Sequence, residues 1–121
     1  MKKRIIKLDE TSAAGNHYTT EVMQKALDAL AGKQLLGTLC IGEISTIIDL
    51  ADVSHVVDNL AIEDGYLVGE ITILDTPRGS ALKALREDAY RFAPCGTGIR
   101  DEDGKIRDFT LTSISATLQG Y

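Results

Sequence analysis

The sequence predicts an α+β fold dominated by strands: a partly closed antiparallel β-barrel with two main helices. Three observations predict it. Short runs of β-branched residues and leucine alternate with glycine and aspartate over most of the chain. Only residues 19–31 and 75–90 combine helical apolar spacing with capping residues. The final apolar segment, 106–118, changes phase near Thr112-Ser113, which indicates a β-bulge of the kind that helps a sheet curl.

The first third of the chain predicts a strand, a loop and a helix. Residues 5–8 form a short apolar run, and residues 11–16 have the composition of a loop. Thr19 or Thr20 can cap the following helix, and Gly32 ends it. The buried stripe of this helix is expected to comprise Val22, Met23, Ala26, Leu27 and Leu30.

The middle of the chain, residues 33–74, predicts several strands. Asp64-Gly65 separates two strand-like runs and has the composition of a two-residue hairpin turn. In the second run, 66–74, apolar residues occupy both faces, which is typical of a central or barrel strand.

The last third predicts the second helix and a closing hairpin. Asp75-Thr76-Pro77 is a helix start, and the helix is expected to run to about residues 88–90. The glycine-rich segment 93–98 is expected to form a turn. Residues 101–104 form another turn, which leads into a long final strand, 106–118.

Composition places the chain among small acidic domains. With 121 residues it is expected to fold as one domain, 1–121, and its net charge is −5. A basic face is lacking, so we expect no nucleic-acid partner. No apolar stretch is long enough for a membrane helix, and the N-terminus does not continue into a signal peptide. Two scattered cysteines favour a reducing compartment, the cytoplasm.

Few residues suggest chemistry, and each has a structural alternative. Cys95, between a proline and a glycine-rich segment, is either an exposed nucleophile or a small buried thiol. His55 suits a hydrogen-bonded core histidine and His17 a surface or capping role. Ser54 is not expected to pair with His55, because neighbours along a strand point to opposite faces. The turn 101–104 is expected to be a solvated hairpin rather than a calcium loop.

No cofactor or metal site is predicted. Gly96-Thr97-Gly98 is an isolated G-x-G motif. It lacks the further glycines of a dinucleotide-binding motif and the lysine of a P-loop. Two histidines and two cysteines, far apart in the sequence, do not have the spacing of a zinc site.

The order of the sequence elements resembles the prohead (head maturation) proteases of tailed bacteriophages, whose fold is related to herpesvirus assemblin. The resemblance covers most of the chain, from about residue 16 to 118. The motifs that carry it are, in chain order, Asn16-His17-Tyr18, Gly37-Thr38-Leu39-Cys40-Ile41-Gly42, Val53-Ser54-His55, Asp75-Thr76-Pro77-Arg78-Gly79, Ala93-Pro94-Cys95-Gly96-Thr97-Gly98 and Asp103-Gly104-Lys105-Ile106-Arg107-Asp108-Phe109.

The chain departs from this family at the positions that the resemblance implies for catalysis. Cys40-Ile41 stands where the general-base histidine is expected, and Pro94-Cys95 stands where the serine is expected. Neither Cys40 nor Ile41 can exchange a proton as imidazole does near neutral pH. The resemblance therefore implies a protease fold that is catalytically degenerate. The remaining candidate pair is Cys95 with His55.

The leading hypothesis is a phage virion protein, a head decoration, stabilising or minor head protein. It would be made in the host cytoplasm, lack enzyme activity and bind the major capsid protein or another head protein; a homo-oligomer is left open. The alternative is an active prohead maturation protease that uses Cys95 with His55. A third hypothesis is a cytoplasmic interaction module with no viral role. Incubation with a capsid or scaffold precursor separates the virion protein from the active protease, because only the protease would cleave it.

Overall fold

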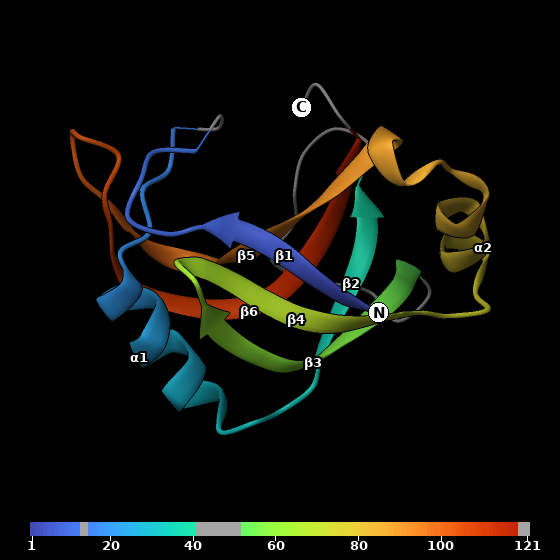
Figure 1. Ribbon diagram of the computed structural model, residues 1–121, viewed down its shortest axis with the longest axis horizontal. Coiled ribbons are helices and arrows are strands. Elements are labelled where there is room, and N and C mark those ends of the chain that lie inside the picture. Colours follow the sequence, from blue (N-terminus) through green and yellow to red (C-terminus); the bar gives the residue numbers. More distant parts are fainter. Residues whose placement is uncertain (13–14, 41–51, 119–121) are drawn as a thin grey trace.

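The computed structural model describes residues 1–12, 15–40 and 52–118 (Figure 1). The elements follow in chain order: β1 (Lys2–Lys7), α1 (Thr20–Leu30), β2 (Leu35–Cys40), β3 (Val53–Glu63), β4 (Tyr66–Ile73), α2 (Pro77–Ala84), the 3₁₀ turn η2 (Glu87–Ala89), β5 (Tyr90–Arg100) and β6 (Ile106–Leu118). The predicted α+β class with two main helices is confirmed.

The strands of the described residues form one curled sheet with the order β1-β4-β3-β2-β6-β5. Most neighbours are antiparallel, but β2 and β6 are parallel, with Leu39 opposite Ala116 and Cys40 opposite Thr117. The prediction of a purely antiparallel barrel is therefore wrong in this pair. The sheet is a half-barrel of mixed strands, with α1 at one end and α2 at the other (Figure 1).

Local turn and cap signals in the sequence agree with the structure. Asp64 and Gly65 both have positive φ, 52° and 79°, as a tight hairpin between β3 and β4 requires. Thr19 caps α1 by accepting the N–H of Val22, and Thr76 caps α2 by accepting the N–H of Gly79. The bulge predicted near Thr112-Ser113 is confirmed, because the β5–β6 register moves from Cys95–Ser113 to Gly96–Leu111.

Two predicted boundaries are wrong. Helix α2 ends at Ala84, because Leu85 is already extended, and a 3₁₀ turn follows where the helix was expected to continue. The glycine-rich segment 93–98 is no turn but lies inside strand β5. A Cβ at Gly96 would lie 1.9 Å from the Thr110 carbonyl oxygen, so this glycine allows two strands to approach closely.

The core fills the inner, concave face of the curled sheet. Its fully buried members include Met23 of α1, Leu82 of α2 and Ile114 of β6. Each helix therefore contributes a side chain to the same core, which fixes both helices against the sheet. Neither α1 nor α2 is long and apolar enough to cross a membrane, and these are the α-helices of the described residues.

Candidate functional site

His55 lies on the inner face of the sheet, and its ring is wholly buried. Its Nε2 lies 2.6 Å from the Ile114 carbonyl oxygen, and its Nδ1 lies 2.7 Å from Ser54 Oγ. A carbonyl oxygen only accepts, so Nε2 donates to it. In the neutral ring Nδ1 then accepts the hydroxyl proton of Ser54. The edge of the ring also packs against Phe92, with 5.2 Å between ring centroids.

The contact between Ser54 and His55 corrects the sequence prediction that these side chains point apart. The register between β2 and β3 moves from Gly37–His55 to Thr38–Val53, which leaves Ser54 as an extra residue in β3. A β-bulge of this kind turns neighbouring side chains toward the same side. The strict alternation on which the prediction depended does not hold here.

Gly37 makes room for the His55 ring. A Cβ at this position would lie 2.1 Å from His55 Nε2 and 2.1 Å from the Ile114 carbonyl oxygen. The imidazole thus bridges from β3, across Gly37 of β2, to the backbone of β6. It satisfies a buried carbonyl that strand β2 does not reach, because the β2–β6 pairing involves only Leu39 and Cys40.

Burial lowers the pKa of His55 below the usual 6.5, and the hydrogen bond to Ile114 only partly opposes this. The ring is therefore neutral at physiological pH. A neutral, fully buried imidazole with both nitrogens engaged has the properties of a structural histidine, as the sequence favoured.

Cys95 lies on the outer face of the same sheet. Cys95 and Phe92 are three residues apart in β5, ahead of the register shift, so their side chains point to opposite faces. Phe92 contacts His55, whereas Cys95 Sγ lies 2.9 Å from Ser115 Oγ. The candidate pair of Cys95 and His55 is thus separated by the sheet itself, and no hydrogen bond between them occurs within the described residues.

The two cysteines at the positions that the resemblance singled out, Cys40 and Cys95, instead share one face. Side chains on the outer face of β2, β6 and β5 form a buried cluster of thiols and hydroxyls, which we call the thiol–hydroxyl cluster: Cys40, Cys95, Ser113, Ser115 and Thr117. The alternation of Ser113, Ser115 and Thr117 with Ile114, Ala116 and Leu118 was visible in the sequence, but which face they joined was not.

The thiol–hydroxyl cluster is poorly suited to proton transfer. Burial raises the pKa of the Cys95 thiol, and its hydrogen bond with Ser115 opposes this only in part. Cys95 is only 4% exposed. Hydroxyls do not titrate near neutral pH, so the described residues of the cluster include no group that could act as a general base there.

Of the four residues at the positions where the resemblance implies catalysis, the structure describes Cys40, Pro94 and Cys95. Pro94 lies in β5 opposite Ile114, and Cys40 is buried at the end of β2 with its Sγ 3.9 Å from the Thr38 carbonyl oxygen. Ile41 lies outside the described residues.

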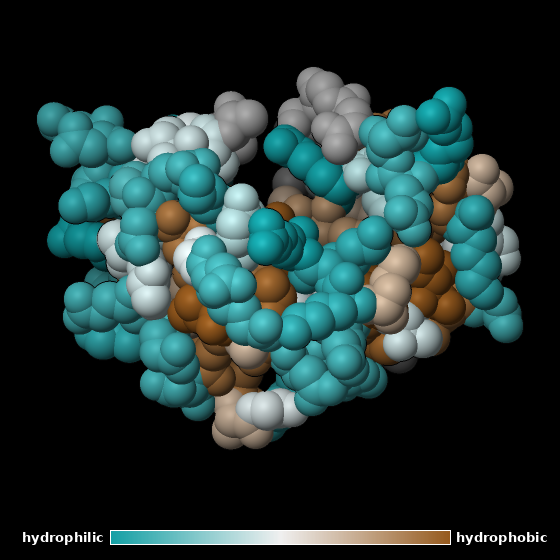
Figure 2. All heavy atoms as spheres, in the orientation of Figure 1, coloured by the Kyte–Doolittle hydropathy of each residue, from teal (hydrophilic) through white to brown (hydrophobic). Residues whose placement is uncertain are grey.

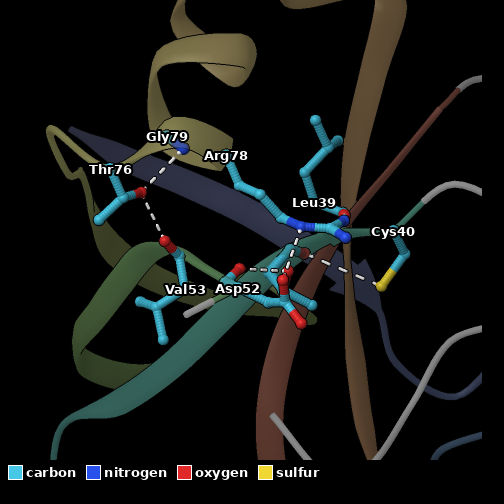
Figure 3. Close-up of polar contacts among 8 residues, drawn as sticks. Leu39, Cys40, Asp52, Val53, Thr76, Arg78 and Gly79 are labelled. Carbon is cyan, nitrogen blue, oxygen red and sulfur yellow. Dashed lines mark hydrogen bonds and ion pairs between the residues drawn. The ribbon is translucent and has the colours of Figure 1, made fainter. Parts of the chain in front are cut away.

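The segment Asp75-Thr76-Pro77-Arg78-Gly79 ties α2 to the ends of β2 and β3 (Figure 3). Arg78 Nη1 donates to the Leu39 carbonyl oxygen at 2.7 Å, and its Nε donates to Asp52 at 3.2 Å. Thr76 donates its hydroxyl to the Val53 carbonyl oxygen at 2.5 Å. The motif therefore has a positioning role, and it orients the strand ends beside Cys40.

The other candidates from the sequence have structural contacts. Thr19, not His17, caps α1. His17 is half-buried, its N–H donates to the Gly104 carbonyl oxygen, and its own carbonyl oxygen accepts the N–H of Ile106. Asp101 Oδ1 accepts the N–H groups of Asp103 and Lys105, which satisfies the hairpin turn internally. In the described ranges, no three His, Cys, Asp or Glu side chains gather as a metal ion would need.

Comparison with known proteins finds a similar fold among solved structures. The sequence matches no protein-family model and no curated protein. A solved structure, the capsid assembly protease of bacteriophage T4, aligns with 98% of this chain and 80% of its own, at a TM-score of 0.76 and 14% identity. The chain has a fold like that of a phage capsid protease. This agrees with the fold that the sequence motifs implied.

Proposed function

We propose that this chain is a phage head protein that keeps a capsid-protease fold and binds the capsid shell without cleaving it. Its role would be that of a head decoration, stabilising or minor head protein. The observation that carries the phage context is the structural similarity to the T4 capsid assembly protease over nearly the whole chain. Function transferred through a fold is an analogy, so the residues themselves must support the loss of activity.

Two observations support the loss of activity. Cys95 is buried and its pKa is raised, so thiolate is scarce at neutral pH. His55 points to the other face of the sheet and uses both ring nitrogens within the core. A protease needs nucleophile and base in contact, and removing that arrangement leaves little catalysis beyond binding.

The acidic surface supports a protein partner. The net charge of −5 disfavours contact with packaged DNA, whose phosphates repel it. We therefore infer that the partner is the major capsid protein or another head protein, met on the protein surface of the shell.

The test is to look for the chain in purified heads. Mass spectrometry of isolated phage heads, with sedimentation of the purified chain together with empty capsids, is expected to find it bound at a fixed ratio to the capsid protein. A chain that is present in the infected cell but absent from heads, and that does not sediment with capsids, would overturn the proposal and favour the cytoplasmic interaction module.

A further inference from the structure

A groove of about 410 Å³ runs along the open seam of the half-barrel, between β1 and β5. Its walls include residues 3–6 of β1 and residues 90–94 of β5. Consecutive residues line a groove only where the edge of a strand faces it, since alternate residues would line it if a face did. The groove is thus bounded by the two edge strands of the described sheet.

Pro94 shows how the edge of β5 is oriented. Pro94 lies opposite Ile114 of β6. The carbonyl group of Ile114 points to His55 and away from β5, so Pro94 and Ile114 exchange no backbone hydrogen bonds. The proline, which has no N–H, is tolerated because its nitrogen faces away from β6. Backbone groups two residues apart in a strand point to the same side, so the N–H and carbonyl groups of Phe92 also point away from β6, toward the groove. A strand edge with this orientation can pair with an added strand.

The floor of the groove is apolar and its rim is basic. Ile5, Tyr18, Tyr90 and Phe92 contribute the floor, and each is less than 9% exposed. Among the described residues the charged lining residues are Lys3, Arg4, Arg91 and Glu87. These three cations and one acid make the described lining basic on a chain of net charge −5, and the guanidinium of Arg4 also lies over the Tyr66 ring, 4.4 Å from its centroid. Figure 2 shows apolar surface in recesses between hydrophilic side chains on the face that carries β1.

An ion pair spans the seam. Lys3 Nζ of β1 lies 3.5 Å from the carboxylate of Glu87 in η2, the turn that leads into β5. Both side chains are solvent-accessible, so the ion pair contributes little and opens easily. A carboxylate that entered the groove could replace Glu87 as the partner of Lys3.

We propose that the groove between β1 and β5 binds an extended segment of a partner protein in which apolar and acidic residues alternate. The segment would add a strand to an edge of the sheet, place its apolar side chains on the floor and pair its carboxylates with the basic rim. This deepens the capsid-binding function and rests on it for the source of the segment.

The positive charge of the rim indicates that the bound segment comes from a different protein rather than from a second copy of this chain. A second copy that presented its own β1 edge would bring Lys2, Lys3 and Arg4 against the same cations. Like charges placed directly opposite each other across two strands are destabilising. An acidic strand from a partner meets no such repulsion.

The test uses the full chain and synthetic peptides. The probe is a capped ten-residue peptide that alternates valine with glutamate. One control alternates valine with lysine, and another carries proline at every second position and cannot pair as a strand. Amide chemical shifts are followed by NMR during titration. We expect saturable shifts in β1 and β5 with the acidic peptide alone, weakening as salt rises.

Two variants break the Lys3–Glu87 pair in opposite ways. Lys3→Glu makes the rim more acidic and is expected to weaken binding about tenfold, while Glu87→Gln leaves Lys3 free and is expected to strengthen binding about threefold. Both lose the same salt bridge, so a merely structural effect would move both in one direction. Unchanged thermal unfolding of each variant shows that the fold is intact.

Several results would overturn the proposal: equal binding of the acidic and basic peptides, shifts confined to other strands, or no binding. Self-association of the chain through the seam, seen by analytical ultracentrifugation, would also overturn it in favour of a second copy. The head assay is independent. A chain found in heads without peptide binding refutes the groove alone, and peptide binding by a chain absent from heads refutes the capsid function alone.

Discussion

His55 and Cys95 lie on opposite faces of one sheet, and their surroundings differ in kind. The inner face holds an imidazole whose two nitrogens have fixed partners and which bridges three strands. The outer face holds thiols and hydroxyls, and the hydrogen bonds of Cys95 to described residues go to the Ser115 hydroxyl and the Ala93 carbonyl oxygen, neither of which is a base near neutral pH. His55 therefore supports the fold, while Cys95 has no base in contact among the described residues. The comparison separates what holds this fold together from what protease chemistry would need.

The strongest test of the inner face is Gly37→Ala. The new Cβ would collide with both His55 Nε2 and the Ile114 carbonyl oxygen, at 2.1 Å each, and one of these groups is backbone. We expect a loss of about 4 kcal/mol in the free energy of unfolding, enough to unfold much of the protein at 37 °C. Denaturant titration measures it. Gly98→Ala, whose Cβ would approach no atom closer than 3.0 Å, is the matched control and is expected to cost far less.

Replacing His55 removes the bridge itself. His55→Ala leaves a cavity and the Ile114 carbonyl unsatisfied, so we expect a loss of about 3 kcal/mol, measured by urea unfolding. Ser54→Ala removes one hydrogen bond and is expected to cost about 1 kcal/mol. A His55→Ala variant as stable as the parent chain would show that the imidazole is dispensable, and would make a catalytic role more credible.

His55 also makes the stability of the folded chain depend on pH. Its folded-state pKa is lowered below 6.5, so the unfolded chain takes up the proton first as the pH falls. The stability that neutral His55 contributes is present above pH 6.5 and is lost as the pH falls below 6.5 through the folded-state pKa. Thermal unfolding between pH 7.5 and 5 should show this decline. A His55→Gln variant should show a flatter profile over the same range, whereas an identical slope in both would assign the decline to other groups.

We expect substitutions on the outer face to change the free energy of unfolding less than those on the inner face. Cys95→Ala removes one thiol hydrogen bond and a little volume, so we expect a change of about 1 kcal/mol or less in the free energy of unfolding. In the folded chain at pH 7 the Cys95 thiol should react with a disulfide reagent at least about a hundredfold more slowly than in urea, because it is buried and protonated. A Cys40→Ala variant isolates the signal of Cys95. Rapid reaction in the folded state would contradict the burial of this thiol.

Sequence reasoning succeeded where the signal is local. Thr19, Thr76 with Pro77, and Asp64-Gly65 each act through their neighbours in the chain, and each is found in its expected role. The bulge near Thr112 was also visible, because a long strand displays its own change of phase.

The errors arose where tertiary pairing decides. Nothing near Leu39 indicates that β2 pairs in parallel with β6, some 77 residues later in the chain. Gly96 resembles a turn residue by composition, yet its lack of a side chain serves the close approach of Thr110. The bulge that brings Ser54 to His55 exists only because β3 pairs with β2 in a shifted register. For the same reason the sequence could not tell that Cys95 and His55 face opposite sides.

The central claim is that this capsid-protease fold does not cleave protein through Cys95 and His55. The most direct measurement incubates the purified chain with unprocessed capsid and scaffold precursors, beside Cys95→Ala and Ser54→Ala, and follows the products by mass spectrometry. The account predicts intact precursors in every sample. Specific cleavage by the parent chain that Cys95→Ala abolishes would contradict it.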